Sequence, residues 1–437
     1  MPELAAFFVV NRARRATSII AFWWVARMSI KSVASTPELP SARSASGSGE
    51  QGAVTDHHLA RIQSAWRSIV PEALRSLRAH TLFTGLIAIY VAAELYLPAL
   101  MGVETPFTPA FSYRFFLMMS AITLAFPACL YGLYVMIWIR PKALVAYLAN
   151  AARRFLSVRR IFTALPVIAL FPFFGSAFAF FRILLPNIHP FAWDTTLAKL
   201  DRTVHGDINP WQLLQPLLGH PFITASINGV YHLWFLLMFG MFLWQSGSLT
   251  RPHTRMQFFL TFILIWAILG NALAILLASA GPVYYSRVTG LPSPYQPLME
   301  YLHAANEVAP VMALDVQEAL WGSYVRDGLA TLGGITAMPS MHVATSLSFA
   351  LVAYAHNRRL GHLFLFFTFI VQIGAVHLGW HYAIDGYVAA IGTLLVWWGV
   401  GRFLSLAWVR HLLWGEERTV VGLREPRTAG LGSAVSG

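Results

Sequence analysis

Three side chains in the second half of the chain recur at every fourth position: His377, His381 and Asp385. If one helix runs through them, this spacing places all three on the same face. A carboxylate beside a histidine holds the imidazole in one tautomer and stabilises its protonated form, which leaves the other ring nitrogen free to attack phosphorus. The spacing therefore predicts a nucleophilic His381 that is supported by Asp385.

A second polar segment, Thr336–His342, precedes His381 and leads into an apolar run. Pro339 suits the first turn of a helix, where its missing N–H is not needed, so we expect a helix to begin there. The free backbone donors and the dipole of such an end attract phosphate. His342 would then lie within the first turn, beside any anion bound there.

The composition indicates that a membrane surrounds these segments. Of the 437 residues, 57% are hydrophobic and 11% are charged, whereas soluble domains have about 25% charged residues. The net charge of +12 comes from short Arg and Lys clusters between apolar runs, which argues against a nucleic-acid partner and indicates membrane topology. We predict an all-α, polytopic helical bundle with eight spans: 81–101, 112–138, 161–181, 221–244, 256–278, 340–355, 363–378 and 381–403.

The loop charges predict the orientation of these spans. Arg and Lys residues crowd the loop between the second and third spans, which marks that loop as cytoplasmic. By contrast, the 59 residues 279–337 contain only two basic residues, Arg287 and Arg326. Both termini are then cytoplasmic, and both polar segments face the periplasmic, extracytoplasmic or lumenal side.

We expect the chain to divide into five parts. Residues 1–56 form a basic and apolar start followed by a disordered linker, and 57–80 form an amphipathic helix on the cytoplasmic surface. Residues 81–160 hold two accessory spans and a basic loop, 161–410 a six-helix catalytic core, and 411–437 a cytoplasmic tail.

The two polar segments carry a resemblance to a known family. Pro339–His342 resembles the Pro-Ser-x-His motif, and His381–Asp385 the His-x-x-x-Asp motif, of the type-2 phosphatidic acid phosphatase superfamily. The His-Tyr-x-x-Asp form, together with Gly281–Tyr285, is similar more narrowly to the inositol phosphorylceramide synthase and sphingomyelin synthase branch. The resemblance covers about residues 161–403 and implies a six-helix core.

The resemblance also implies roles for the motif residues. His381 would form a phosphohistidine, Asp385 would orient it, and His342 would protonate the leaving alkoxide and then deprotonate the incoming water or alcohol. Ser340 and Tyr382 would contact the substrate. No metal or other cofactor is implied, because histidines and positioned donors stabilise the charge.

One part of the phosphatase pattern is absent. Neither Arg140–Pro141 nor Arg251–Pro252 has a Lys seven residues earlier, and Gly374–Ala375 stands where a Ser-Arg pair would be. The missing basic clamp favours the synthase-like branch over a standard phosphatase. Its replacements are expected among the outward-side candidates Arg182, Tyr285, Arg287 and His377.

We therefore expect phosphoryl or phospho-headgroup transfer from a phospholipid to a polyol or lipid alcohol. Hydrolysis of a lipid phosphate is the first alternative, a zinc site on His377, His381 and Asp385 is the second, and a transporter with a His/Asp proton relay is the third. A further segment, 193–206, has helical spacing. Its Asp194, Asp201 and His205 are read as a solvated polar face, with contact to the site as the alternative.

Overall fold

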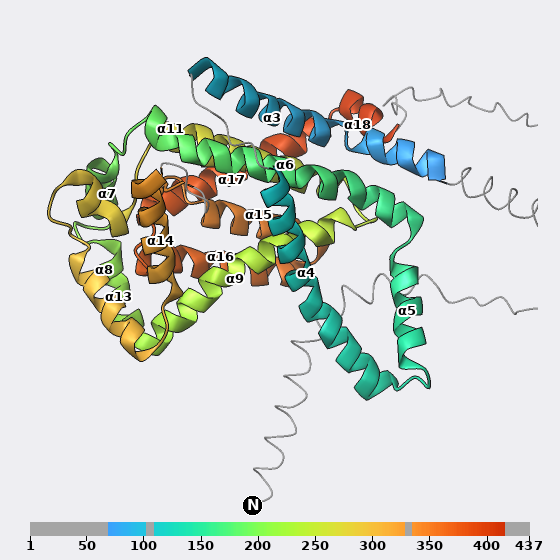
Figure 1. Cartoon of the computed structure of the whole chain (residues 1–437), viewed down its shortest axis with the longest axis horizontal. Helices are drawn as coiled ribbons and strands as arrows, with labels where there is room; N and C mark the ends of the chain where they lie inside the picture. The colour runs from blue at the N-terminus through green and yellow to red at the C-terminus, as the bar shows by residue number, and fades with distance from the viewer. Residues whose placement is uncertain (1–68, 102–108, 328–333, 416–437) are drawn as a thin grey trace, which may run out of the picture.

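The computed structural model describes residues 69–101, 109–327 and 334–415, and within these ranges every regular element is helical (Figure 1). Helical spans are expected in a bilayer, because each backbone polar group must be satisfied inside its own segment. The predicted all-α, polytopic bundle is confirmed. The predicted segment 1–56, the first half of 57–80 and most of the tail 411–437 lie outside the described residues.

Six long helices are apolar enough to cross a membrane, and a bent pair of helices would make a seventh span. The bent pair joins Ile69–Ala79 to α3 (Thr81–Met101) at an angle of 58°. The remaining predicted span, 340–355, corresponds to α15 (Met341–His356), which has only 16 residues. Every predicted span therefore has a helix, although α15 is shorter than a typical membrane crossing of about 20 residues.

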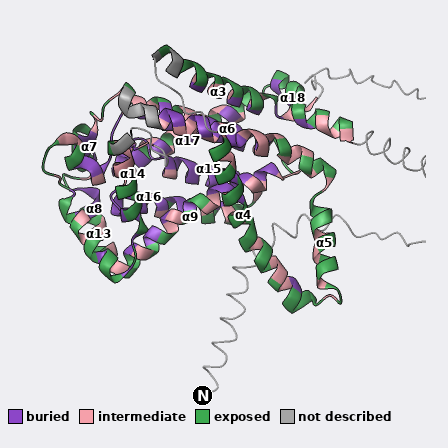
Figure 2. Ribbon diagram, in the orientation of Figure 1, coloured by how far each residue is buried: buried purple, intermediate pink, exposed green. Residues whose placement is uncertain are grey.

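The helices around the predicted site pack as one bundle (Figure 2). Its centre is α15, whose residues are buried along almost the whole length. Around it lie α6 (Val158–Ile188), α9 (Pro221–Ser246), α10 (Pro252–Ala267), α16 (Arg358–His377) and α17 (Ala383–Leu404). From α10 the chain continues through η2 (Ile268–Leu273) and α11 (Ala274–Leu276).

Accessory helices lie beside and below this bundle. α4 (Pro109–Tyr134) continues into η1 (Val135–Ile139) and buries few side chains, so most of its surface faces outward. α5 (Leu144–Phe155) buries none and has Arg153 and Arg154 in its last turn. It runs across the direction of the bundle (Figure 1), as an amphipathic helix does at a membrane surface. The short α18 (Ala407–Trp414) packs beside α17.

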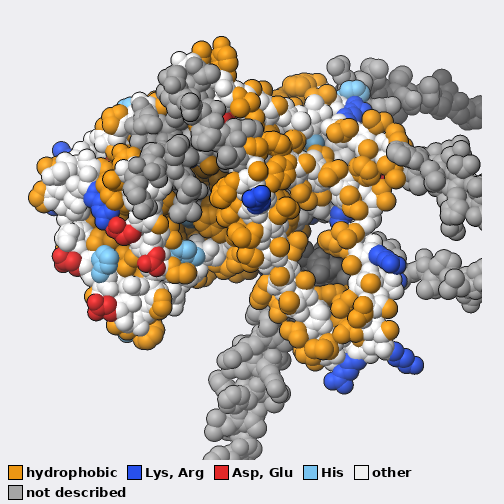
Figure 3. Space-filling model, viewed as in Figure 1, with side chains coloured by type: hydrophobic (Ala, Val, Ile, Leu, Met, Phe, Trp, Pro, Cys, Tyr) orange, Lys and Arg blue, Asp and Glu red, His pale blue; other side chains and the backbone are white. Residues whose placement is uncertain are grey.

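The opposite end of the bundle carries a cap of short helices. These are α7 (Asp194–Val204), α8 (Pro210–Leu218), η3 (Pro282–Tyr284), α12 (Tyr285–Thr289), α13 (Gln296–Val308) and α14 (Met312–Asp327). Figure 3 shows acidic side chains gathered over the cap and Lys and Arg side chains near α5. The two ends of the molecule therefore differ in charge.

Candidate active site

The three spaced residues do not share one helix. α16 ends at His377, and α17 begins only at Ala383, with Gly379 at a φ of 73° in the turn between them. The condition for a single stripe is therefore not met, because a glycine in the left-handed region ends the first helix, and the break agrees with the predicted spans 363–378 and 381–403. The break separates His377 from the two residues that follow it.

His377 lies in a separate hydrogen-bond cluster. Its ring is fully buried, and Nε2 lies 2.9 Å from the Thr224 hydroxyl of α9. That hydroxyl also lies 2.7 Å from the Tyr301 hydroxyl of α13. These contacts connect α16 to α9 and the cap, and they direct the ring toward neighbouring helices. We interpret His377 as a structural residue. The sequence had suggested a contact between His377 and the phosphate.

His381 and Asp385 lie together on the turn and the first turn of α17. The Nδ1 atom of His381 is 2.8 Å from the Ala337 carbonyl and 3.4 Å from Oδ2 of Asp385. A carbonyl can only accept, so Nδ1 carries the proton and Nε2 has a free lone pair. Asp385 is completely buried, and its Oδ2 also accepts the Tyr382 backbone N–H at 3.0 Å. This arrangement fixes the tautomer that a nucleophilic Nε2 needs.

The second histidine lies across from the first. His342 is the second residue of α15, and its ring centroid is 6.2 Å from that of His381. It packs between Tyr231 and Trp234 of α9, with centroid distances of 4.5 and 4.4 Å. Two aromatic neighbours hold the imidazole at one orientation. The two histidines of the separate motifs therefore lie close to each other in the fold.

The start of α15 differs slightly from the sequence prediction. The helix begins at Met341 with Ser340 as its N-cap, so Pro339 lies before the helix instead of in its first turn. Ser340 is fully buried, its N–H donates to the Asp385 carbonyl, and its hydroxyl has no partner among the described residues. The N–H groups of the first turn and this hydroxyl are donors available to an anion.

Asp201 of α7 holds the beginning of α17. Its two carboxylate oxygens accept the N–H groups of Ala383 and Ile384 at 3.2 and 3.0 Å. These are N–H groups that the first turn of a helix leaves without an internal partner. Burial raises the pKa of Asp201, and the two N–H groups oppose that rise. Asp201 thus fixes the turn that presents His381 and Asp385.

Asp194, two turns earlier on α7, connects two loops. Its oxygens accept the N–H groups of Ala280 and Gly281 at 2.8 Å each, and the Tyr382 hydroxyl at 2.8 Å. Burial raises the pKa of this carboxyl as well, against the same three donors. Gly281 has a φ of 96°, and a Cβ there would lie 2.5 Å from the Trp380 carbonyl. Only glycine suits this crossing of the two loops.

These contacts overturn the favoured interpretation of the segment 193–206. Asp194 and Asp201 are 1% and 2% exposed, so they do not form a solvated face. The segment is helical as predicted, but the two aspartates share its buried side with Leu197 and Ala198, whereas Leu200 and Val204 are exposed. The spacing could not predict the burial of the two aspartates, because the N–H groups that they accept belong to segments far along the chain.

Arg182 is the predicted clamp candidate that lies nearest the motifs. At the outer end of α6, it donates to the Thr336 hydroxyl at 2.5 Å and to the Gly334 carbonyl at 3.2 Å. It lies within electrostatic reach of His342. Thr336 immediately precedes Ala337, whose carbonyl accepts the hydrogen bond from Nδ1 of His381. A guanidinium in this position can pair with a phosphate at the two histidines.

The other candidates lie further into the cap. Arg287 pairs with Glu318 at 2.5 Å and lies over the Trp321 ring. Tyr285 is buried against the Tyr295 ring, with a centroid distance of 6.0 Å. Tyr382 is buried and directs its hydroxyl at Asp194, as described above, so it supports the loops rather than facing open space. The geometry gives none of these groups a contact with His381 or His342.

The described residues contain no group of three His, Cys, Asp or Glu side chains that could hold a metal ion. The zinc alternative needs His377 and His381 on one face, but the chain leaves the helix between them. The His377 ring bonds to Thr224 instead. The geometry therefore does not support that ligand set.

The comparison with known families matches the part of the chain that carries these residues. Residues 195–399 match the model of the PAP2 superfamily. This segment is similar to a PAP2 domain. No curated protein and no solved structure matches the chain significantly. The matched range includes both motifs and Asp201, whereas Arg182, Asp194 and the accessory helices lie outside it.

The match supports an enzyme of the phosphatase or phosphotransferase type found in the type-2 phosphatidic acid phosphatase superfamily, and the apolar helices set the protein in a membrane. Within the domain, the two motif histidines and Asp385 are the residues whose geometry suits phosphoryl transfer.

Proposed function

We propose that this PAP2 protein is a lipid phosphotransferase, similar to the inositol phosphorylceramide synthase branch, that acts through a phosphohistidine on His381. The observation that carries the proposal is the hydrogen bond from His381 Nδ1 to the Ala337 carbonyl at 2.8 Å. With that proton held, Nε2 is the free nucleophile. Asp385 at 3.4 Å stabilises the positive charge that the ring gains on attack.

In the first step Nε2 of His381 bonds to phosphorus as the bond to the leaving oxygen breaks. His342 donates a proton to that oxygen, which leaves as an alcohol. In the second step His342 takes the proton of an acceptor hydroxyl, whose oxygen bonds to phosphorus as the N–P bond breaks. The ring separation of 6.2 Å suits a phosphoryl group bound between the two histidines.

Arg182 supplies positive charge in place of the missing Lys and Arg clamp. Its guanidinium already lies beside the segment that leads to His342. The Ser340 hydroxyl and the first-turn N–H groups of α15 supply further donors. Preorganised donors of this kind stabilise charge that develops on the phosphoryl oxygens.

Transfer is favoured over hydrolysis by the burial of the site. His381 is 7% exposed, and Asp385 and Ser340 are fully buried. The cap closes over the turn that holds His381, since Gln317 of α14 donates to the Leu378 carbonyl at 2.9 Å. A site with little access to water protects a phosphohistidine from hydrolysis until an alcohol arrives.

The side of the membrane follows from charge. Exposed Lys142, Arg153 and Arg154 lie around α5, at the end opposite the cap. Basic loops stay cytoplasmic, so the cap and the site would face the non-cytoplasmic side. A His303→Cys variant in a Cys129→Ala background should react with an impermeant thiol reagent in intact cells. Labelling only after permeabilisation would reverse the orientation.

The activity is tested with purified protein in vesicles that contain a headgroup-labelled phospholipid. Transfer of label to an added polyol or lipid alcohol, with little release in its absence, is the expected result. His381→Ala should abolish transfer, while His303→Ala, a change at an exposed histidine of the cap, should not. Release of phosphate at the same rate with and without any alcohol would establish hydrolysis instead.

A further inference from the structure

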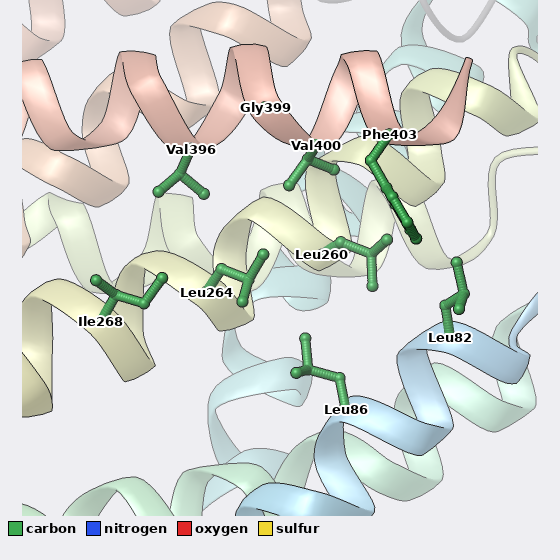
Figure 4. Close-up of a pocket in the computed structure, with 9 residues that line it drawn as sticks. All are labelled: Leu82, Leu86, Leu260, Leu264, Ile268, Val396, Gly399, Val400 and Phe403. Atoms are coloured by element: carbon green, nitrogen blue, oxygen red, sulfur yellow. The ribbon is translucent and has the colours of Figure 1, made fainter. Parts of the chain in front are cut away.

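A cavity of about 390 Å³ lies between α3, α10 and α17, away from the two histidines (Figure 4). Figure 4 shows leucine, isoleucine, valine and phenylalanine side chains pointing into it from all three helices. Its walls include Leu86 of α3, Leu264 of α10 and Val396 of α17, and no polar side chain lines it. The volume falls within the range of small-molecule pockets, about 300–1,000 Å³.

The cavity opens toward the hydrocarbon of the bilayer. Two of its wall residues, Ile268 and Phe403, are 45% and 37% exposed. α10 and α17 belong to the membrane spans and α3 to the bent pair that would form another. An apolar hollow offers water no hydrogen bonds and stays dry unless an apolar group fills it. Hydrocarbon is therefore its natural occupant.

One end of the cavity adjoins a polar cluster near the active site. Tyr90 lies one turn beyond Leu86 on α3, and its hydroxyl is hydrogen-bonded to the Asn271 side chain. Asn271 follows Gly270, whose carbonyl accepts from Arg182 at 3.5 Å. Beyond the wall residue Leu86, α3 therefore carries Tyr90, which is linked through Asn271 and Gly270 to Arg182 of α6.

The polar cluster offers what a phospholipid headgroup requires. Arg182 is the cation, and its Thr336 contact leads to the loop that holds His381. Glu94, one turn beyond Tyr90, is fully buried, and both of its oxygens lack a partner among the described residues. Buried acceptors without a partner can take hydrogen bonds from the hydroxyl groups of a headgroup, while Arg182 supplies the cation for its phosphate.

The dimensions fit one acyl chain. Asn271 at the polar end and Leu260 in the far wall are 11 residues apart along α10 and η2, which corresponds to about 16 Å. This is about half of the ~30 Å hydrocarbon core, the depth that the chains of one leaflet occupy. A lipid with its phosphate at Arg182 would therefore place its chain along these walls.

We infer that the cavity between α3, α10 and α17 binds an acyl chain of the lipid substrate, with the phosphate held at Arg182. The inference rests on the proposed function, since it takes the substrate to be a phospholipid that reaches His381. It gives the accessory helix α3, which lies outside the matched range 195–399, a part in substrate binding.

The test compares long-chain and short-chain forms of one phospholipid. Leu86→Trp and Leu264→Trp fill the cavity from two walls, while Ile89→Trp adds the same bulk on the outward face of α3, where Ile89 is 70% exposed. A chain that leaves bilayer hydrocarbon for the cavity gains little from burial itself, so the tryptophans act by crowding the chain, and kcat/KM for the long-chain lipid should fall by about tenfold. The short-chain value should stay within about twofold of wild type.

An equal loss with both lipids, or no loss with either, would overturn the inference and leave the cavity to a structural lipid. If the tryptophan variants fail to fold, Leu86→Ala serves instead. The larger cavity of this variant should shift the substrate preference toward bulkier acyl chains. An unchanged preference would count against the inference. A wild-type protein inactive on both forms would refute the proposed function itself. The control Ile89→Trp must retain the wild-type chain preference.

Discussion

Asp201 provides the sharpest test of how the fold holds the active site. Its carboxylate accepts two N–H groups at the start of α17, from Ala383 and Ile384. In Asp201→Asn, one oxygen still accepts, but the new NH₂ group faces the second N–H. One hydrogen bond to a charged acceptor, about 1.5–3 kcal/mol, is lost, and a buried donor remains unpaired. We expect the free energy of unfolding to fall by about 2–3 kcal/mol.

Activity should fall as well, because α17 carries Asp385 and follows the His381 turn. Asp201 lies behind the turn and does not face the substrate, so kcat should fall by about tenfold or more while KM changes little. Thermal unfolding in detergent, followed by tryptophan fluorescence, gives stability, and the transfer assay gives kcat and KM.

The matched control is Asp207→Asn, a few residues along the same segment. Asp207 is exposed and has a φ of 61°, which asparagine tolerates, and only its backbone makes hydrogen bonds. This variant should behave as wild type. An Asp201→Asn protein with wild-type unfolding and kcat would refute the assignment of Asp201 as a positioning residue.

Three further substitutions separate structural from functional contacts. Tyr382→Phe removes one of three donors to Asp194, so stability should fall by about 1 kcal/mol in thermal unfolding; no change would mean that the contact contributes nothing. Thr224→Val removes the hydroxyl that is hydrogen-bonded to His377. The free energy of unfolding should fall, while kcat stays within about twofold. A large loss of kcat without a loss of stability would indicate that His377 belongs to the catalytic site. Arg287→Ala breaks a partly exposed ion pair and should change neither stability by more than about 1 kcal/mol nor KM; a large rise in KM would make it a phosphate contact.

Much of the architecture could be predicted from hydropathy, because membrane spans are long and apolar. All eight predicted spans coincide with helices. The departure is α15, whose 16 residues are enclosed by neighbouring helices and therefore need not meet lipid along a full crossing. The bend before α3 falls at the predicted boundary between the surface helix 57–80 and the span 81–101, although no proline or glycine marks it in the sequence.

The proximity of the two motifs could be predicted from the order and orientation of the spans, and His381 lies near both Asp385 and His342 in the structure. Their catalytic roles stay predictions. Whether His377 shares a helix with His381 could not be decided from periodicity, because spacing does not show whether Gly379 ends the helix, as its positive φ does here.

Long-range contacts could not be predicted. The sequence favoured a solvated face for Asp194 and Asp201, because aspartates are usually exposed to solvent. Their partners lie 86 residues or more away along the chain. Only the fold brings those N–H groups to the carboxylates. The position of Arg182 near the motifs could not be predicted either, because it depends on a hydrogen bond to Thr336, 154 residues later in the chain.

The central claim is that His381 carries the phosphoryl group. Protein incubated with phospholipid labelled in the phosphate, then quenched in alkali and analysed by mass spectrometry, should hold phosphate on His381. His342→Ala should both gain and lose this label more slowly than wild type, because His342 serves as the acid of the first step and the base of the second. His381→Ala should hold none. Label that persists in His381→Ala, or that appears on another residue of the wild-type protein, would contradict the account.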